Sequence, residues 1–273
     1  MKLERLGYPV VDLHVHMRQD RHHLVAACDG GISTVVCMPN TSPCLDNREA
    51  IEQYDAMLGR EFMRTKAFPT SAITIGREGK TPVDFEANRP LVVGFSDDGN
   101  CLEDLDIFRR GLEHGVLMMM HCEPETEMAE KYIDVYSQVG KGHLHIQHVS
   151  LASTVKVLYE TKQSGLKFTA ETCPHYFTYD CFAESHPVNP PLATPGDVEI
   201  IRRGLAIGAI DVIASDYAPL PRPKGTGFAS FLSFIPLSYG LVLDGTLTLE
   251  QLKEKIHTNP LKIIASGNPT LLR

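Results

Sequence analysis

The sequence lacks several features that would point to particular classes of protein. Its seven cysteines are scattered and include no Cys-x-x-Cys pair, and no apolar segment follows a basic start at Met1. These absences argue against a disulfide framework and a secretory signal, so we expect a reducing cytoplasm. No apolar run approaches the roughly 20 residues that span a bilayer. The formal net charge of -8 argues against nucleic acid as a partner.

The composition is that of an ordinary globular protein. Of the 273 residues, 43% are hydrophobic and 22% are charged, and neither low-complexity segments nor fixed-period repeats interrupt the chain. Barrels of alternating strands and helices commonly form one domain of about 250 residues. We therefore expect one domain, residues 1–273, with a single large core.

Short apolar runs recur along the chain, and most are apolar nearly throughout, as strands buried on both faces of a parallel sheet are. Helical patterns separate them, and such alternation over eight strands favours an α/β fold of the (β/α)8 TIM-barrel type over an open sheet. The predicted strands are residues 10–17, 33–40, 66–75, 91–98, 116–123, 143–150, 167–175 and 211–219.

The intervening segments carry the spacing of amphipathic helices, except for residues 76–90, which have a weak pattern. A Pro/Gly-rich loop is expected at residues 221–227. The predicted helices are residues 20–29, 46–60, 103–114, 124–138, 151–164, 196–207 and 247–257.

The first strand contains a His-x-His pair. Because alternate side chains of a strand point the same way, His14 and His16 share a face with Asp12 and Arg18. Two imidazoles on one face are half of a metal site. A chance pair, or a structural pair in the core, is the alternative when this segment is considered alone.

Polar side chains also end most of the other predicted strands. In a barrel of this type, the chemistry gathers at the carboxyl ends of the strands. Imidazole and carboxylate groups suit Zn²⁺ or a similar ion, and this set could hold one ion or an adjacent pair. The residues at these ends are His14, His16, Asn40, Asp97, Asp98, His121, His148, His175 and Asp216.

Taken in order, these motifs resemble those of the dihydroorotase family, a cyclic-amide branch of the amidohydrolase superfamily. The resemblance runs from about residue 10 to residue 260, and allantoinases and hydantoinases share most of it. The motifs are Asp12-x-His14-x-His16-x-Arg18, Met38-Pro39-Asn40-Thr41, Phe95-Ser96-Asp97-Asp98-Gly99, His121-Cys122-Glu123, His148-Val149-Ser150, Glu171-Thr172-Cys173-Pro174-His175, Asn189-Pro190-Pro191-Leu192, Ala214-Ser215-Asp216-Tyr217-Ala218-Pro219 and Thr258-Asn259-Pro260.

The resemblance implies a set of metal ligands. His14 and His16 would bind a first metal, His121 and His148 a second, and Asp216 would touch the metal and the catalytic water. Many relatives bridge the two ions with a carboxylated lysine, but this chain has no lysine between Lys80 and Lys131. Asp98 resembles the aspartate that some dihydroorotases carry instead. One-metal and two-metal states both stay open at this point.

The resemblance also implies the roles of the other site residues. Asp216 would carry the proton from the attacking water to the leaving nitrogen. Arg18, Asn40 and Asn189 would bind the substrate, the first two through its carboxylate. We expect Asp97 to point to the opposite face, His145 to face the helices, and His175 to have a supporting or packing role.

Several residues depart from the family pattern on the side of substrate recognition. The motif after Asp216 commonly reads Asp-His-Ala-Pro-His, but Tyr217 and Leu220 occupy the two histidine positions, and leucine donates no hydrogen bond. The arginine that often follows Pro-Pro-Leu is Ala193, and a Gly-Leu-Glu-Thr element appears as Ser-Phe-Leu-Ser at residues 230–233. Arg222 or Lys224 could supply positive charge, although a solvated loop charge is the simpler interpretation.

Two classes of function follow. The first is a zinc-dependent enzyme, with one or two ions per chain, that reversibly hydrolyses dihydroorotate to N-carbamoyl-aspartate in pyrimidine synthesis; allantoinase and hydantoinase are alternatives within this class. The second is a subunit without turnover that assists aspartate carbamoyltransferase, with which the family often assembles. A homo-oligomer is also open. We expect a barrel that lacks most or all of the small β domain of longer relatives.

Overall fold

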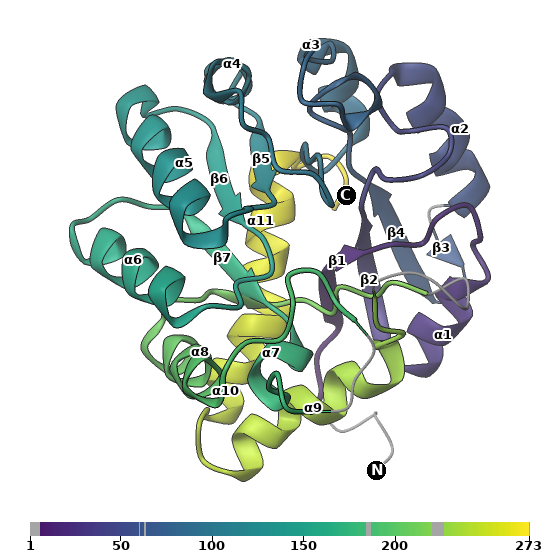
Figure 1. Cartoon of the computed structure of the whole chain (residues 1–273). Coiled ribbons are helices and arrows are strands. Elements are labelled where there is room, and N and C mark those ends of the chain that lie inside the picture. Colours follow the sequence, from purple (N-terminus) through teal and green to yellow (C-terminus); the bar gives the residue numbers. More distant parts are fainter. Residues whose placement is uncertain (1–5, 60, 63, 184–186, 220–226, 273) are drawn as a thin grey trace.

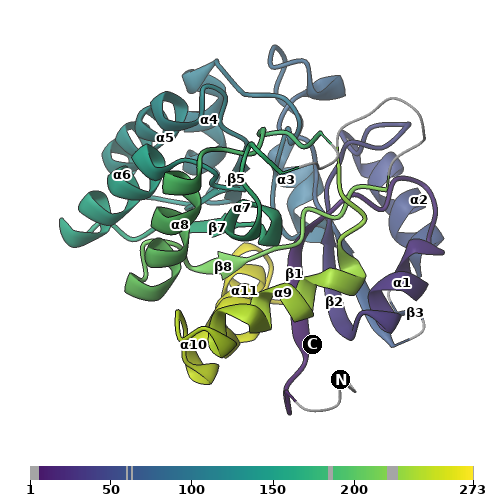
Figure 2. The same cartoon turned by 60° about the horizontal axis from the view of Figure 1, so that its bottom comes forward.

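The computed structural model describes residues 6–59, 61–62, 64–183, 187–219 and 227–272. It shows a ring of strands surrounded by helices (Figures 1 and 2). The strands are β1 (Val10–Val15), β2 (Ile32–Cys37), β3 (Glu61–Phe62), β4 (Thr65–Pro69), β5 (Leu117–Met120), β6 (His143–Ile146), β7 (Thr169–Thr172) and β8 (Val212–Ile213).

The helices between the strands follow the predicted alternation. The α-helices are α1 (His23–Asp29), α2 (Arg48–Leu58), α3 (Phe85–Asn88), α4 (Leu105–Glu113), α5 (Glu125–Val139), α6 (Ala152–Gln163), α7 (Pro174–Thr178), α8 (Pro195–Ile207), α9 (Phe231–Leu243), α10 (Leu249–Lys253) and α11 (Asn259–Gly267). Shorter turns of other helical types are η2 (Ile75–Arg77), η3 (Arg89–Leu91) and η4 (Glu254–Thr258).

Local sequence signals begin several of these helices. The hydroxyl of Thr194 accepts from the amide of Asp197, whose carboxylate accepts from the Thr194 amide, and Pro195 occupies the first position of α8. Thr248 and Gln251 form the same reciprocal cap on α10. Three helices lie outside the predicted ones, α7, α9 and α11, and α3 lies in the weakly patterned segment 76–90. The predicted helix 247–257 is divided between α10 and the π-helical turn η4.

The strands close into a parallel barrel, as predicted. One sheet has the order β1-β2-β4-β3, in which β3 is antiparallel, and the other has the order β5-β6-β7-β8. Single parallel bridges join them: Val15 pairs with Tyr217 at one junction, and Phe95 pairs with both Ser71 and Met118 at the other. The result is a (β/α)8 barrel.

The fourth predicted strand, residues 91–98, is much shorter than expected, because only Phe95 bridges its neighbours. The chain turns directly afterwards, where the Ser96 hydroxyl accepts a hydrogen bond from the Asp98 amide at 3.0 Å. The Ser96 amide still donates to the Ser71 carbonyl at 2.9 Å, so the chain leaves the strand ladder after Ser96. The turn places Asp98 at the end of the barrel instead of leaving it in a strand.

The barrel interior has its own hydrophobic core, which α11 completes. Ile263 and Ile264 of α11 pack with Leu13, Leu117 and other interior side chains, and α11 crosses the middle of the ring in Figure 1. The approach is close, because a Cβ on Gly267 would lie 1.9 Å from the Val93 carbonyl oxygen. A second, larger core fills the layer between strands and helices. Polar groups are thereby concentrated at the opposite end of the barrel.

No helix in the described part of the chain is long and apolar enough to cross a membrane. All seven cysteines are free, and three of them, Cys37, Cys122 and Cys173, are buried. Burial raises the pKa of Cys122 and Cys173 well above the usual thiol value, so both are protonated at neutral pH.

Candidate metal centre

The predicted ligands meet at the carboxyl ends of the strands. His14 is in β1, and the others follow the strands or, for Asp98, the Phe95 bridge, where the chain leaves the barrel wall. All are buried, and all but His14 line one pocket of about 130 Å³. The residues brought together are His14, His16, Asp98, His121, His148 and Asp216.

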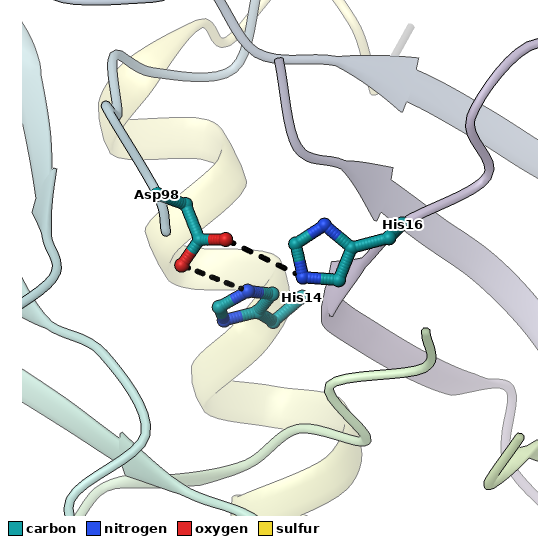
Figure 3. Close-up of side chains that lie close together, drawn as sticks. All are labelled: His14, His16 and Asp98. Carbon is teal, nitrogen blue, oxygen red and sulfur yellow. Dashed lines mark ion pairs between the residues drawn. The ribbon is translucent and has the colours of Figure 1, made fainter. Parts of the chain in front are cut away.

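Asp98 lies close to both His14 of β1 and His16, which directly follows that strand. Its Oδ1 lies 3.3 Å from His14 Nε2, and its Oδ2 lies 3.4 Å from His16 Nε2. Figure 3 shows both carboxylate oxygens directed toward the two rings. The ligand atoms of these three residues lie within 4.8 Å of one another, the spacing of a metal-binding group.

The same carboxylate belongs to a second group. Asp98 Oδ1 lies 3.5 Å from His148 Nε2 and 3.8 Å from His121 Nδ1, and these two ring nitrogens are 2.8 Å apart. Burial alone would raise the pKa of Asp98, but the charge of His14 and hydrogen bonds from the surrounding imidazoles hold it well below its usual value. Asp98 is therefore an ionised group shared by both triads.

The donor atoms of these residues suit a metal ion, because hydrogen bonds in the part of the chain that the structure describes leave one of them without a partner. Within the described residues, His14 Nε2 is buried without a hydrogen-bond partner although it faces the Asp98 carboxylate. A buried ring nitrogen without a partner is costly in a finished protein core. Imidazole and carboxylate donors in two triads with one shared member form a site suited to one or two first-row ions.

A buried carboxylate behind His14 orients the ring. His14 Nδ1 lies 2.7 Å from Glu171 Oε1, and Glu171 Oε2 lies 3.1 Å from His145 Nε2. Burial raises the pKa of Glu171, but the charge of His14 and bonds from His14 and His145 outweigh it and lower that pKa to about 2. The Nδ1–H bond leaves His14 Nε2 free for a metal. The sequence alone assigned no role to Glu171. The available signal was a glutamate within a predicted buried strand, residues 167–175.

We predict that Glu171→Gln weakens metal binding by about 10- to 100-fold, the usual effect of removing a group that orients a ligand. The neutral amide would no longer fix the protonated Nδ1 tautomer of His14. Zinc titration of the metal-free protein would measure the effect. The control is Glu86→Gln, which alters an exposed Glu–His pair at 2.8 Å from His114. Equal zinc affinity in wild type and Glu171→Gln would contradict the assignment.

His145 corrects a prediction made from strand alternation. It was expected to face the helices, but its ring points into the barrel, where it contacts Glu171 and the hydroxyl of Thr169. The alternation fails because β6 ends at Ile146 and His148 has a φ of 35°. His145 therefore has a structural role, as predicted, but it supports the metal centre from inside.

Asn40 orients the second histidine. Its Oδ1 lies 2.8 Å from His16 Nδ1, and its backbone oxygen accepts a bond from Arg18 Nη1 at 2.9 Å. Both residues, together with Asn189, line the pocket beside the metal ligands. The three predicted substrate-binding residues thus lie together, and Asn40 also contacts a ligand ring, which was not anticipated.

Asp216 lies on the same side as the β1 histidines. Its Oδ1 is 2.9 Å from His16 Nε2 and 3.6 Å from His14 Nε2. Burial alone would raise the pKa of Asp216. The charge of His14 and the hydrogen bond with His16 outweigh burial and lower that pKa, so the carboxylate is ionised. Its φ of 47° turns the chain after β8, a conformation that few residues other than glycine, asparagine and aspartate adopt readily.

Two other polar residues near the strand ends lie outside the two triads that share Asp98. Asp97 accepts bonds from the amides of Ile73 and Thr74, so it braces a loop, as predicted for the opposite face. His175 is buried beside Tyr176, and both of its ring nitrogens are without partners in the described part of the chain. Burial lowers the pKa of His175 to about 4, so its ring is neutral. Its ring, the Cys173 thiol and the Asp216 carboxylate have ligand atoms within 4.8 Å of one another and form a third candidate metal-binding group.

The departures from the expected substrate motif have different outcomes. Tyr217 turns away from the pocket: its ring stacks on Phe231 at 3.7 Å, and its hydroxyl lies 3.0 Å from His23 Nδ1. Leu220, Arg222 and Lys224 lie outside the described residues. Ala193 contributes its backbone oxygen to a bond from the Cys181 amide.

The closed barrel and its two carboxylate-linked histidine pairs define a metal-dependent amidohydrolase. The family model described as dihydro-orotase-like matches residues 6–116. The dihydroorotase of Syntrophobacter fumaroxidans is 31% identical over 316 residues, covering 96% of this chain and 72% of that protein. The chain belongs to the dihydroorotase family.

Solved structures agree on the fold. An L-hydantoinase from Arthrobacter aurescens has a TM-score of 0.79 at 18% identity, covering 94% of this chain and 70% of that one. Dihydroorotase from Saccharomyces cerevisiae, in complex with 5-fluoroorotic acid, has a TM-score of 0.76 at 15% identity, covering 94% and 84%. An inactive dihydroorotase-like domain from Chaetomium thermophilum has a TM-score of 0.74 at 16% identity, covering 93% and 78%.

Proposed function

We propose that this chain is a zinc-dependent dihydroorotase that interconverts dihydroorotate and N-carbamoyl-aspartate. The observation that carries the proposal is the sharing of Asp98 between two histidine pairs, in the pocket that also contains Arg18 and Asn40. The arrangement supports two ions, held by His14 and His16 on one side and by His121 and His148 on the other. Asp98 would then bridge them in place of a carboxylated lysine.

The chain's own residues would transfer the proton and bind the substrate. Bound zinc would act as a Lewis acid that activates water and polarises the ring carbonyl. Asp216, ionised and adjacent to His14 and His16, would accept the proton of the attacking water and return it to the leaving amide nitrogen. In the reverse direction, it would take the proton from the attacking carbamoyl nitrogen as the ring closes and give it to the departing oxygen, which leaves as water. Arg18, Asn40 and Asn189 would fix the substrate, with the Arg18 guanidinium on its carboxylate.

The second candidate is a partner subunit without turnover, for example of aspartate carbamoyltransferase. Three observations favour it, the first two being the likeness to a domain described as inactive and the packing of Tyr217 away from the pocket. The match to the Syntrophobacter relative also spans 316 residues although this chain has 273, so the relative contains segments that this chain lacks. The intact ligand set favours the enzyme.

A comparison of substrates tests the proposal. Metal-free protein and protein reloaded with zinc would be assayed against dihydroorotate, hydantoin, allantoin and dihydrouracil. We expect hydrolysis only after reloading, with dihydroorotate the fastest substrate, because Arg18 matches its carboxylate. Faster hydrolysis of a neutral ring would favour a hydantoinase-type enzyme. Zinc-loaded protein that is inert toward all four would favour the partner subunit.

A further inference from the structure

Arg77 lies beside the metal centre, at the end of the turn η2 that follows β4. Its backbone has a φ of 58°, after a φ of 60° at Gly76, and its amide donates to the Thr74 carbonyl at 2.9 Å. Its own carbonyl accepts from Asn100 Nδ2 at 2.8 Å. An arginine held in the left-handed region needs such support from its surroundings. The side chain is thereby fixed over the segment that carries Asp98.

The guanidinium of Arg77 reaches the wall of the pocket. Its Nη1 donates to the Asp98 carbonyl oxygen at 2.5 Å. The next residue, Gly99, lines the pocket, and a Cβ there would lie 3.6 Å from Arg77 Nη1 and 3.9 Å from Asn40 Nδ2. Because Gly99 has no side chain, two hydrogen-bond donors lie next to the same point of the wall.

Among the described residues, neither Arg18 nor Arg77 forms a direct ion pair, although the charges of Asp98 and Asp216 act on Arg18 and that of Arg77 acts on Asp97. Arg77 Nε is buried and has no hydrogen-bond partner among the described residues. In that part of the chain, the arginines in ion pairs are Arg48 and Arg202, both outside the pocket. Burial lowers the pKa of Arg18; the charges of Asp98 and Asp216 oppose that shift, and the charge of Arg77 adds to it, so the two guanidinium groups lie near enough to act on each other. Two neighbouring guanidinium groups that are not held in direct ion pairs keep hydrogen-bond donors available for an anion between them.

We propose that Arg77, with Arg18 and Asn40, binds the carboxylate of the substrate and so determines specificity for acidic cyclic amides. This inference rests on the proposed dihydroorotase function and deepens it. It assigns to η2 a recognition role that sequence comparison would place in the loop after Asp216, where Leu220 occupies the position of the expected donor.

The competing explanation is purely structural. Through its bond to the Asp98 carbonyl, Arg77 could position that carboxylate without touching substrate. A positioning role would change metal content and kcat for every substrate. A recognition role would change KM and the binding of carboxylates, with metal content preserved.

The experiment compares Arg77→Met, Arg77→Lys and the control Arg89→Met in zinc-loaded protein. Arg89 also donates to a backbone carbonyl, that of His114 at 3.1 Å, but at an exposed position. We expect Arg77→Met to raise the KM for dihydroorotate and the Kd for orotate by about 10- to 100-fold, the usual effect of losing a charged hydrogen bond. Zinc content and kcat should change little, Arg77→Lys should recover part of the loss, and Arg89→Met should match wild type.

Each outcome decides the inference. A fall in zinc content or kcat at unchanged KM and orotate Kd would overturn it in favour of positioning, and unchanged kinetics and orotate Kd would overturn it as well. If wild type does not hydrolyse dihydroorotate, the proposed function fails, and the orotate titration alone decides. Weaker orotate binding by Arg77→Met, partly restored in Arg77→Lys, would still support carboxylate recognition. Absent orotate binding by wild type would overturn both.

Discussion

Replacing Asp216 by asparagine is expected to lower dihydroorotate hydrolysis by roughly 10²- to 10⁴-fold, the usual share of a side chain that transfers a proton. Asparagine has nearly the same shape, keeps an oxygen facing His16, and tolerates the φ of 47° at this position. It cannot accept the proton of the attacking water. The loss should therefore appear in kcat, with the fold intact.

The measurement is steady-state hydrolysis of dihydroorotate, with zinc content and thermal unfolding recorded for the same samples. The control is Asp180→Asn, which changes a carboxylate that accepts a bond from the Phe182 amide on the surface. We expect this variant to match wild type. An Asp216→Asn protein that keeps its zinc and its turnover would refute the proton-transfer role.

Replacing Asp98 by asparagine is expected to have the largest effect on metal binding. Asp98 is common to both triads, so its loss weakens both half-sites together. An amide offers one oxygen and no negative charge, and its nitrogen does not bind zinc at neutral pH. The affinity should fall by more than the roughly 10- to 100-fold caused by altering a supporting group, and hydrolysis should be lost with it.

The adjacent residue supplies a matched control for Asp98. Asp97 has the same chemistry one position earlier, but it holds the amides of Ile73 and Thr74 on the other side of the chain. Asp97→Asn should lower the thermal midpoint and leave zinc content unchanged. If Asp97→Asn lost zinc as Asp98→Asn does, the bridging role of Asp98 would have no support.

The fold was predictable from the sequence because each barrel strand is a short apolar run followed by a helical pattern. The prediction of the fourth strand was less accurate, because the chain turns before the apolar and polar run ends. Residues 91–98 have the composition of a strand, yet the backbone bonds to the neighbouring segment end at Ser96, and the Ser96 hydroxyl accepts from the Asp98 amide in the turn that follows. The helix α11 was missed because its packing inside the barrel depends on contacts with residues as distant in sequence as Leu13.

The grouping of the candidate ligands was also predictable, because barrel topology brings strand ends together whatever their separation in sequence. Orientation was harder to foresee. His148 has a φ of 35° and is not part of a strand, so its side chain does not follow the alternation of faces from which the direction of His145 was predicted. The roles of Glu171 and Arg77 depend on distances across the barrel, 2.7 Å to His14 Nδ1 and 2.5 Å to the Asp98 carbonyl, which no local pattern contains.

A zinc titration of metal-free protein, followed by dihydroorotate hydrolysis at each step, tests the central claim most directly. The account predicts no turnover without metal and turnover that rises until about two equivalents are bound, because Asp98 serves two histidine pairs. Protein that binds zinc fully at these histidines but never hydrolyses dihydroorotate would contradict it.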